Sequence, residues 1–238
     1  MTSIELIDRL KLHGKVLSIK RMEETAQDPV KQKGCALYAL KKALEGETVF
    51  VSQDGLGCRG AAKGFGFSDE IPDIPGGAGH FLSYGGGEGA PPGERIKCSP
   101  ELGERLFAIQ PTHVMDGYKC IRVKPYEDED DADTVTALAT ADQLSLLIHL
   151  FSFRKAILDE VYAPMVSGCA SVFRLPFGEI EREAPRGVIG NVDLFARSGF
   201  DRGTFFFTIT GKDFATVVRD AEESVLAAPI AKKVLQRL

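Results

Sequence analysis

A glycine-rich stretch between residues 55 and 93 constrains this chain more than any other feature. It holds thirteen of the 25 glycines in the sequence. Glycine raises the entropy cost of an ordered backbone, and dense glycine is typical of loops and of places where two backbone segments approach closely. The stretch is too long for a simple connection. It therefore predicts either a functional loop or lid, or a surface excursion with little order.

The segment that leads into this stretch ends in a turn that presents a cysteine. A helix and then a strand are predicted before the turn Gly55-Leu56-Gly57-Cys58-Arg59-Gly60. Residues 153–177 repeat this outline with Cys169 in the place of Cys58. Two interpretations stay open: a duplicated unit that faces its copy across a pseudo-twofold axis, and a chance similarity between two helix–strand units.

The pattern of apolar residues predicts an α+β fold with a mixed or antiparallel sheet and flanking helices. We expect a single domain over residues 1–238, in which half-units 14–125 and 134–227 would intertwine if the chain is duplicated. Thr140 and Gln143 have the spacing of a capping box, which predicts the start of a helix. Strands are predicted at 16–19, 48–52, 96–98, 119–124, 134–138 and 204–210, and helices at 3–13, 35–44, 140–158 and 213–226.

Net charge, the length of apolar runs and the cysteine count limit the partners and the location that we expect for this chain. The net charge of −5 argues against a nucleic-acid binder, which usually carries a basic face. No apolar run approaches the roughly 18 residues that a membrane span needs. Five cysteines without a C-x-x-C pair suggest reduced thiols and a cytoplasmic location. The strand TFFFTIT at 204–210 and the glycine-rich stretch are each candidate surfaces for a homo-oligomer.

The glycines of the cysteine turn match the dinucleotide fingerprint G-x-G-x-x-G only formally. That fingerprint requires a long helix directly after the turn, whose N-terminus faces the pyrophosphate. Gly64 and Gly66 interrupt any such helix early. The sequence therefore disfavours a dinucleotide cofactor.

A cysteine nucleophile is one catalytic hypothesis. A nucleophilic thiol needs a base, which is most often histidine. His80 lies in the glycine-rich stretch and is the candidate base for Cys58, so these two residues are the catalytic candidates for a hydrolase or transferase. The spacing does not select this pair over other pairs.

Metal ligation is a second hypothesis for the cysteines. Three thiolates, from Cys35, Cys58 and Cys169, would hold zinc or an iron–sulfur cluster if the fold brings them together with a fourth ligand. The alternative is that these residues are small buried hydrophobic side chains, which is common for unpaired cysteine. Cys98 and Cys120 are assigned to this alternative.

Basic residues near the glycine turns suggest an anionic ligand. Arginine and lysine side chains, together with the exposed amides of a glycine loop, suit a carboxylate or phosphate. The alternative is ordinary surface charge. The candidates are Arg59, Lys63, Arg174, Arg186, Arg197 and Arg202.

Several blocks of the sequence resemble one family. They read KGCALYALKKALEGETVFVS, GCRGAAKGFGF, VKPYEDEDDADTVTALATADQLSLLIHLF, SGCASVFRLPF and IGNVDLFARSGF. In this order they resemble the prokaryotic ArCR proteins, grouped as domain of unknown function 169, from about residue 31 to residue 227. The resemblance implies a cytoplasmic protein of archaeal or bacterial type and brings no established reaction.

The resemblance also implies which positions belong to a site. Cys35, Cys58 and Cys169 match three cysteines of the family pattern, and Arg197 matches a late arginine. The fourth cysteine position is occupied here by Asn191. Because asparagine is a poor metal ligand, a four-cysteine cluster would need a substitute for this residue.

These observations lead to one main expectation and two alternatives. The main expectation is a small-molecule or cofactor pocket with redox- or metal-linked chemistry at its thiols. The first alternative is a non-catalytic ligand-binding or regulatory module with the glycine-rich stretch as its lid. The second is the cysteine hydrolase or transferase. The expected lining of the pocket is Cys35, Cys58, Arg59, Cys169, Asn191 and Arg197.

Overall fold

The structure, a computed structural model, describes residues 1–25, 28–29, 31, 34–86, 89–128 and 130–238. In chain order the elements are α1 (Ser3–Arg9), β1 (Val16–Met22), η1 (Ala36–Tyr38), α2 (Ala39–Leu44), β2 (Val49–Ser52), η2 (Gln53–Gly55), α3 (Ala61–Phe65), α4 (Ala78–Leu82), α5 (Pro100–Ala108), β3 (Cys120–Pro125), β4 (Thr134–Thr140), α6 (Ala141–Ser152), β5 (Val161–Tyr162), η3 (Ala170–Arg174), α7 (Leu175–Glu179), β6 (Gly187–Gly190), α8 (Leu194–Arg197), β7 (Thr204–Thr210), α9 (Gly211–Asp220), η4 (Val225–Ala227) and α10 (Pro229–Leu235).

One mixed sheet forms the centre of the fold. In the part of the chain that the structure describes, seven strands lie in the order β2-β3-β1-β4-β7-β6-β5. The neighbouring strands are antiparallel except for β5 and β6, which are parallel. Helices flank this sheet, which confirms the predicted α+β class.

The two faces of the sheet belong to two separate apolar cores. Successive side chains of a strand point to opposite faces. On β4 and β7, Leu138 and Phe206 therefore lie in one core, with residues of α2, α3 and η3. Ala137 and Phe207 lie in the other core, with residues of α1, α6 and α9. The sheet is thus the middle of three layers.

Most predicted elements are confirmed, but three helices end earlier than predicted and one strand is wrong. Helix α1 ends at Arg9 instead of residue 13, and α9 ends at Asp220 instead of residue 226. The capping box is present, with Gln143 Oε1 accepting a hydrogen bond from the Thr140 N–H at 2.9 Å, but α6 ends at Ser152. Beyond it Ile157 and Leu158 are exposed, so no apolar face continues the helix. The strand predicted at 96–98 is wrong, because these residues form bends in a segment that follows two prolines.

The strand TFFFTIT is confirmed as β7, with the predicted bounds. It pairs with β4 on one side and with β6 on the other. Both of its edges are therefore used within the chain. This strand offers no free edge to a second copy, and an interface at the glycine-rich stretch stays a prediction.

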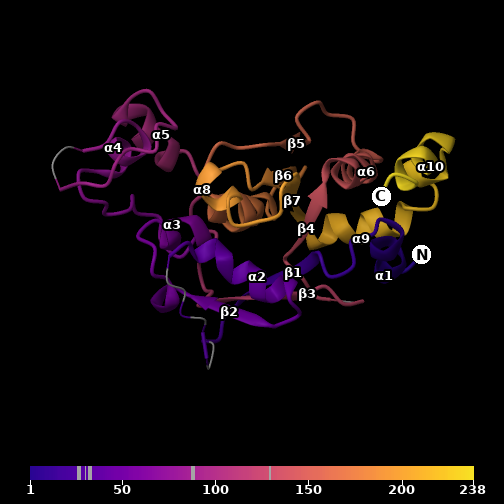
Figure 1. Cartoon of the computed structure of the whole chain (residues 1–238). Helices are drawn as coiled ribbons and strands as arrows, with labels where there is room; N and C mark the ends of the chain where they lie inside the picture. Colours follow the sequence, from indigo (N-terminus) through magenta and orange to yellow (C-terminus); the bar gives the residue numbers. More distant parts are fainter. Residues whose placement is uncertain (26–27, 30, 32–33, 87–88, 129) are drawn as a thin grey trace.

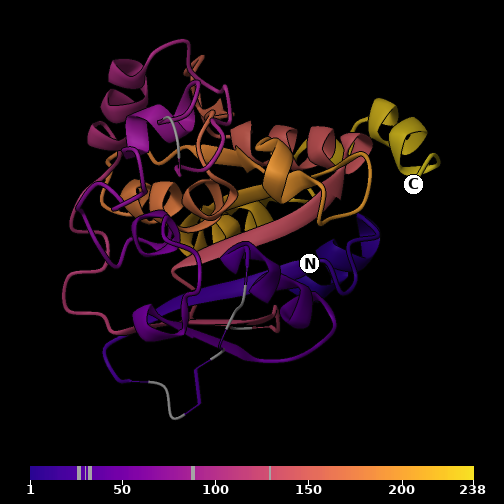
Figure 2. The same cartoon turned by 60° about the vertical axis from the view of Figure 1, so that its left-hand side comes forward.

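The glycine-rich stretch contributes α4 to a pair of helices that lies at one end of the molecule, far from α10 (Figures 1 and 2). Glycines allow α4 and α5 to cross closely. A Cβ atom at Gly79 would lie 2.3 Å from the Pro100 carbonyl oxygen, and one at Gly103 would lie 2.8 Å from the Gly79 oxygen. The expected close backbone approach is therefore present. Gly87, part of the predicted Gly85-Gly86-Gly87 run, lies outside the described residues.

The two predicted half-units occupy different parts of the sheet. Strands β1 to β3 form one side of it, and β4 to β7 form the other. Cys58 and Cys169 each precede a helical segment, α3 and η3, and these segments pack together with the rings of Phe65 and Phe173 stacked at 4.3 Å. Duplication of the chain itself stays a prediction.

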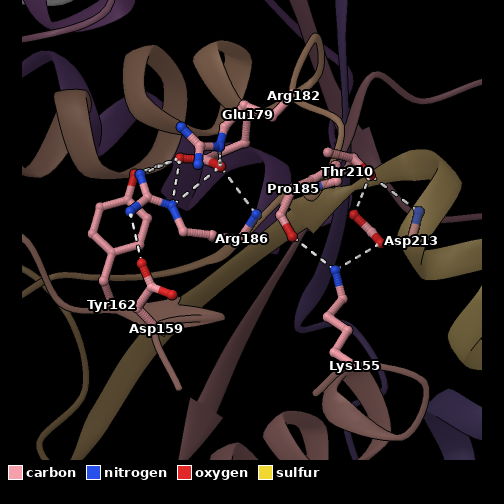
Figure 3. A network of polar contacts seen from close by, with 9 residues as sticks. All are labelled: Lys155, Asp159, Tyr162, Glu179, Arg182, Pro185, Arg186, Thr210 and Asp213. Atoms are coloured by element: carbon pink, nitrogen blue, oxygen red, sulfur yellow. Dashed lines mark hydrogen bonds and ion pairs between the residues drawn. The ribbon is translucent and has the colours of Figure 1, made fainter. Parts of the chain in front are cut away.

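A buried carboxylate, Glu179, connects the parallel edge of the sheet to α7 (Figure 3). Its side chain is 4% exposed and accepts a hydrogen bond from the Tyr162 hydroxyl at 3.2 Å. Arg186 Nη2 lies 2.8 Å from the same oxygen, and Arg182 Nε lies 3.0 Å from the other. Burial, and then the charge of Glu179, raise the pKa of Tyr162, so its hydroxyl stays a donor.

We predict that Glu179→Gln destabilises the fold by about 3 kcal/mol. Removal of one member of a buried ion pair leaves the other charges without compensation, and here two arginines would be affected. Urea denaturation measures the change in the free energy of unfolding. The control is Glu183→Gln, since Glu183 is exposed in the bend that follows α7. Equal midpoints for the two variants would contradict the prediction.

Candidate functional site

Three cysteines from separate parts of the chain line one cavity of about 560 Å³. Cys35 lies directly before η1, Cys58 lies between η2 and α3, and Cys169 lies directly before η3. Arg59, the fourth residue of the expected lining, also borders the cavity. We call this cavity, lined by Cys35, Cys58 and Cys169, the thiol pocket.

The rest of the thiol pocket is largely apolar. Helices α4 and α5 provide one wall through Phe81, Leu82, Leu106 and Phe107. The segment before η3 and the start of α8 contribute further apolar side chains. The pocket therefore lies between the sheet-bearing body of the protein and the α4–α5 pair. Movement of this pair as a lid stays a prediction.

The buried thiols of the pocket are held in the protonated form. Burial, and then the proximity of Cys35 and Cys58, raise the pKa of Cys169 to about 12. Burial is also the main cause that raises the pKa of Cys35, and Cys58 and Asp193 add to it. The direction of these effects agrees with the convergence of the three cysteines on one cavity. Because a thiolate is the nucleophilic form, Cys169 is a poor nucleophile here.

Gly64 brings the backbone of α3 against the deepest thiol. A Cβ atom at this position would lie 2.8 Å from Cys169 Sγ. Any larger residue at Gly64 would have to displace the thiol. The glycine that weakens a dinucleotide fingerprint in the sequence therefore shapes the floor of the thiol pocket.

The structure does not join Cys58 to a histidine. His80 lies on α4, and its neighbours Phe81 and Leu82 line the pocket while its own side chain does not. The ring of His80 packs edge-on against Tyr84, with 5.7 Å between centroids. Within the described part of the chain, no hydrogen bond connects His80 with Cys58. Their role as a catalytic pair stays a prediction without a geometric contact.

Asn191 and Arg197 lie outside the lining of the thiol pocket. Asn191 is fully buried with φ 64°, and neither of its side-chain polar atoms has a hydrogen-bond partner. Arg197 Nη1 donates to the carbonyl oxygens of Asn191 and Thr204, each at 3.2 Å, and the guanidinium stacks over Phe205. Arg197 therefore fixes the turn between β6 and α8. Ligand contact by these two residues stays a prediction.

A metal site is not formed by the present arrangement of side chains. Across the described residues, no group of three or more His, Cys, Asp or Glu side chains is placed to hold a metal ion. Zinc or an iron–sulfur cluster at the three thiols would require these side chains to move together and to lose their protons.

Among the polar residues that the structure adds to the predicted lining, two are buried. Lys63 was recognised in the sequence only as one of several cations near the glycine turns, and Gln110 was not recognised at all. Both line the thiol pocket and both are buried, with 4% and 8% of their surface exposed. The burial of Lys63 results from packing of α3 against η3, which follows more than a hundred residues later, so no local pattern indicates it.

Fold and site together define an α+β protein with an apolar pocket lined by thiols. A family model described as uncharacterised ArCR, domain of unknown function 169, matches residues 5–220. The chain belongs to this family, which confirms the resemblance found in the sequence. Comparison with curated proteins gave no match, and comparison with solved structures gave none either. Among the described residues, no helix has the length and apolar character to cross a membrane.

We predict that iodoacetamide at pH 7 modifies Cys58 and Cys98 and leaves Cys169 unmodified in the folded protein. Cys58 and Cys98 are exposed, whereas Cys169 is buried. A pKa near 12 leaves only about one thiol in 10⁵ ionised at pH 7. Peptide mass mapping measures the modification of each residue, with the urea-unfolded protein as the control for intrinsic reactivity. Rapid modification of Cys169 in the folded protein would contradict the arrangement.

Proposed function

We propose that the protein binds a small, largely apolar organic molecule in the thiol pocket. The observation that carries the proposal is the convergence of Cys35, Cys58 and Cys169 on one cavity of about 560 Å³ with apolar walls. Ligand sites are typically concave and apolar with a few polar groups that orient the ligand, and this volume lies within their usual range. Protonated thiols are polarisable and weakly polar, which suits contact with an apolar ligand.

A buried polar atom supports this role independently of the cysteines. Gln110 Nε2 donates to the Leu106 carbonyl oxygen at 3.3 Å, but Gln110 Oε1 is buried and has no partner. Buried polar atoms are nearly always hydrogen-bonded in folded proteins. Since Gln110 lines the thiol pocket, a polar group of a ligand would satisfy this atom.

Redox- or metal-linked chemistry at the thiols is the second candidate function. The observation in its favour is that Cys35, Cys58 and Cys169 line the same cavity, where Cys35 and Cys58 raise the pKa of Cys169 and Cys58 raises that of Cys35. Cys58 is exposed and would be the thiol that meets an external partner. A cytoplasmic location, where thiols stay reduced, is part of this proposal.

We predict that N-phenylnaphthylamine, a neutral apolar fluorophore, binds in the thiol pocket and that alkylation of Cys58 blocks it. The C98S variant, labelled with N-ethylmaleimide only at exposed Cys58, should bind the probe at least about tenfold more weakly than the unlabelled variant, because the adduct occupies ligand space. Fluorescence titration measures the affinity.

The matched control is the C58S variant labelled at Cys98, which lies outside the lining. This protein should keep its affinity for the probe. Absence of binding to any form of the protein would overturn the proposed function, as would an equal loss of affinity on labelling of either cysteine.

The metal content of the purified protein tests the metal-linked candidate function. Anaerobically purified protein should contain well below one iron or zinc atom per chain, because the three thiols are not placed as ligands and two of them resist ionisation. Elemental analysis together with acid-labile sulfide gives the ratios. Near-stoichiometric metal that is lost in Cys58→Ser would instead establish the second candidate.

A further inference from the structure

The thiol pocket contains a buried cation that has no carboxylate partner. Lys63 lies on α3 with 4% of its surface exposed. Its Nζ donates to the Asp69 carbonyl oxygen at 2.8 Å, and no ion pair is present at this ammonium among the described residues. A lysine ammonium carries three protons, so most of its donor capacity is unused.

The nearest carboxylate serves a different cation. Arg174 is fully buried, and its Nη2 pairs with Asp69 Oδ1. The other carboxylate oxygen of Asp69 accepts the His113 N–H at 3.0 Å. Although burial opposes it, these hydrogen bonds hold the pKa of Asp69 below its usual value. Lys63, Arg174 and Asp69 thus form a group of two cations and one anion.

The excess positive charge is disfavoured in the empty protein. Burial, and then the charge of Arg174, lower the pKa of Lys63, and Asp69 opposes this only in part. A buried charge without a counterion is unfavourable, and an anion placed beside it removes the penalty. Among the described residues, Asp69 is the one anion that raises the pKa of Lys63.

Asp193, one of the two acidic residues of the lining, is hydrogen-bonded to other groups. The Asp193 carboxylate accepts the N–H groups of Gly168, at 3.2 Å, and Phe195, at 3.0 Å. The charge of Asp193 raises the pKa values of Cys35 and Glu94, and it is not among the causes that shift the pKa of Lys63. The lining therefore holds Lys63 together with the acidic residues Asp193 and Glu94, and neither of these forms an ion pair with Lys63 among the described residues.

We propose that the ligand of the thiol pocket is an apolar organic acid whose anionic group pairs with the ammonium of Lys63. This inference rests on the proposed function and specifies its ligand class. The apolar body of the ligand lies against the α4–α5 wall and the thiols, and its acid group replaces the counterion that Lys63 lacks. No covalent step is involved.

Two fluorophores that differ by one acid group test the inference. Anilinonaphthalene sulfonate is N-phenylnaphthylamine with an added sulfonate, so the pair reports the contribution of a single negative charge. We expect Lys63→Met to weaken binding of the sulfonate probe by about tenfold to a hundredfold, the range expected for one charged hydrogen bond, and to leave the neutral probe within about twofold. Lys63→Arg should retain most of the affinity for the sulfonate.

Lys42→Met is the matched control, since Lys42 is exposed on α2 and lies outside the pocket. Circular dichroism and thermal denaturation confirm that each variant is folded. If both probes bind and Lys63→Met changes neither or both equally, the inference is overturned while the proposed function stands. If neither probe competes with N-ethylmaleimide at Cys58, the proposed function fails and the inference fails with it.

Discussion

The geometry of the thiol pocket depends on one buried arginine. Arg174, at the end of η3, donates through Nη1 to the carbonyl oxygens of Lys63 at 2.9 Å and Ser68 at 2.8 Å, and through Nη2 to Asp69. These contacts join η3 to α3 and to the chain that leaves it. Cys169 and Cys58 lie at the starts of these two segments. Arg174 therefore fixes the positions of two thiols and of Lys63 at once.

The same arrangement explains why the pKa values of Cys35 and Cys169 are raised. The stacked rings of Phe65 and Phe173 exclude water from the interface between α3 and η3. Removal from water disfavours the thiolate, and the presence of three thiols in one cavity disfavours it further, since each new negative charge would repel the others. An apolar ligand and a metal ion thus make opposite demands on this pocket. The first fits protonated thiols, whereas the second requires their protons to leave.

The sequence predicts an element of the fold correctly where the local residue pattern alone determines it. TFFFTIT is rich in aromatic and β-branched residues, and β7 has the expected bounds. The helices α4 and α5 were not predicted, because Gly79 and Gly103 have low helix propensity and their value lies in the contact between the two helices. The strand expected at 96–98 is also wrong, because an apolar residue in this segment has a role that depends on distant parts of the chain. Ile96 packs in the pocket wall and does not pair with another strand.

The sequence predicts those residues of the site that lie at glycine turns. Glycine turns drew attention to Cys58 and Cys169, and both line the pocket with Cys35. Lys63 was one of six basic candidates with equal standing, and only the contact with Arg174, 111 residues away, distinguishes it. The turn at Asn191 shows the reverse case. Its arginine, Arg197, resembles a ligand contact in the sequence but holds backbone carbonyls in the structure.

The close crossing of α4 and α5 separates one wall of the thiol pocket from the cores that stabilise the fold. These helices pack mainly on each other and lie apart from the sheet (Figure 2). Their pocket-facing residues, such as Phe81 and Phe107, belong to neither of the two large cores. Substitutions in this wall can therefore change the shape of the pocket while the sheet, the thiols and Lys63 stay in place. Under the proposed function, the shape of the ligand site can therefore vary while its charged and thiol-bearing floor is kept.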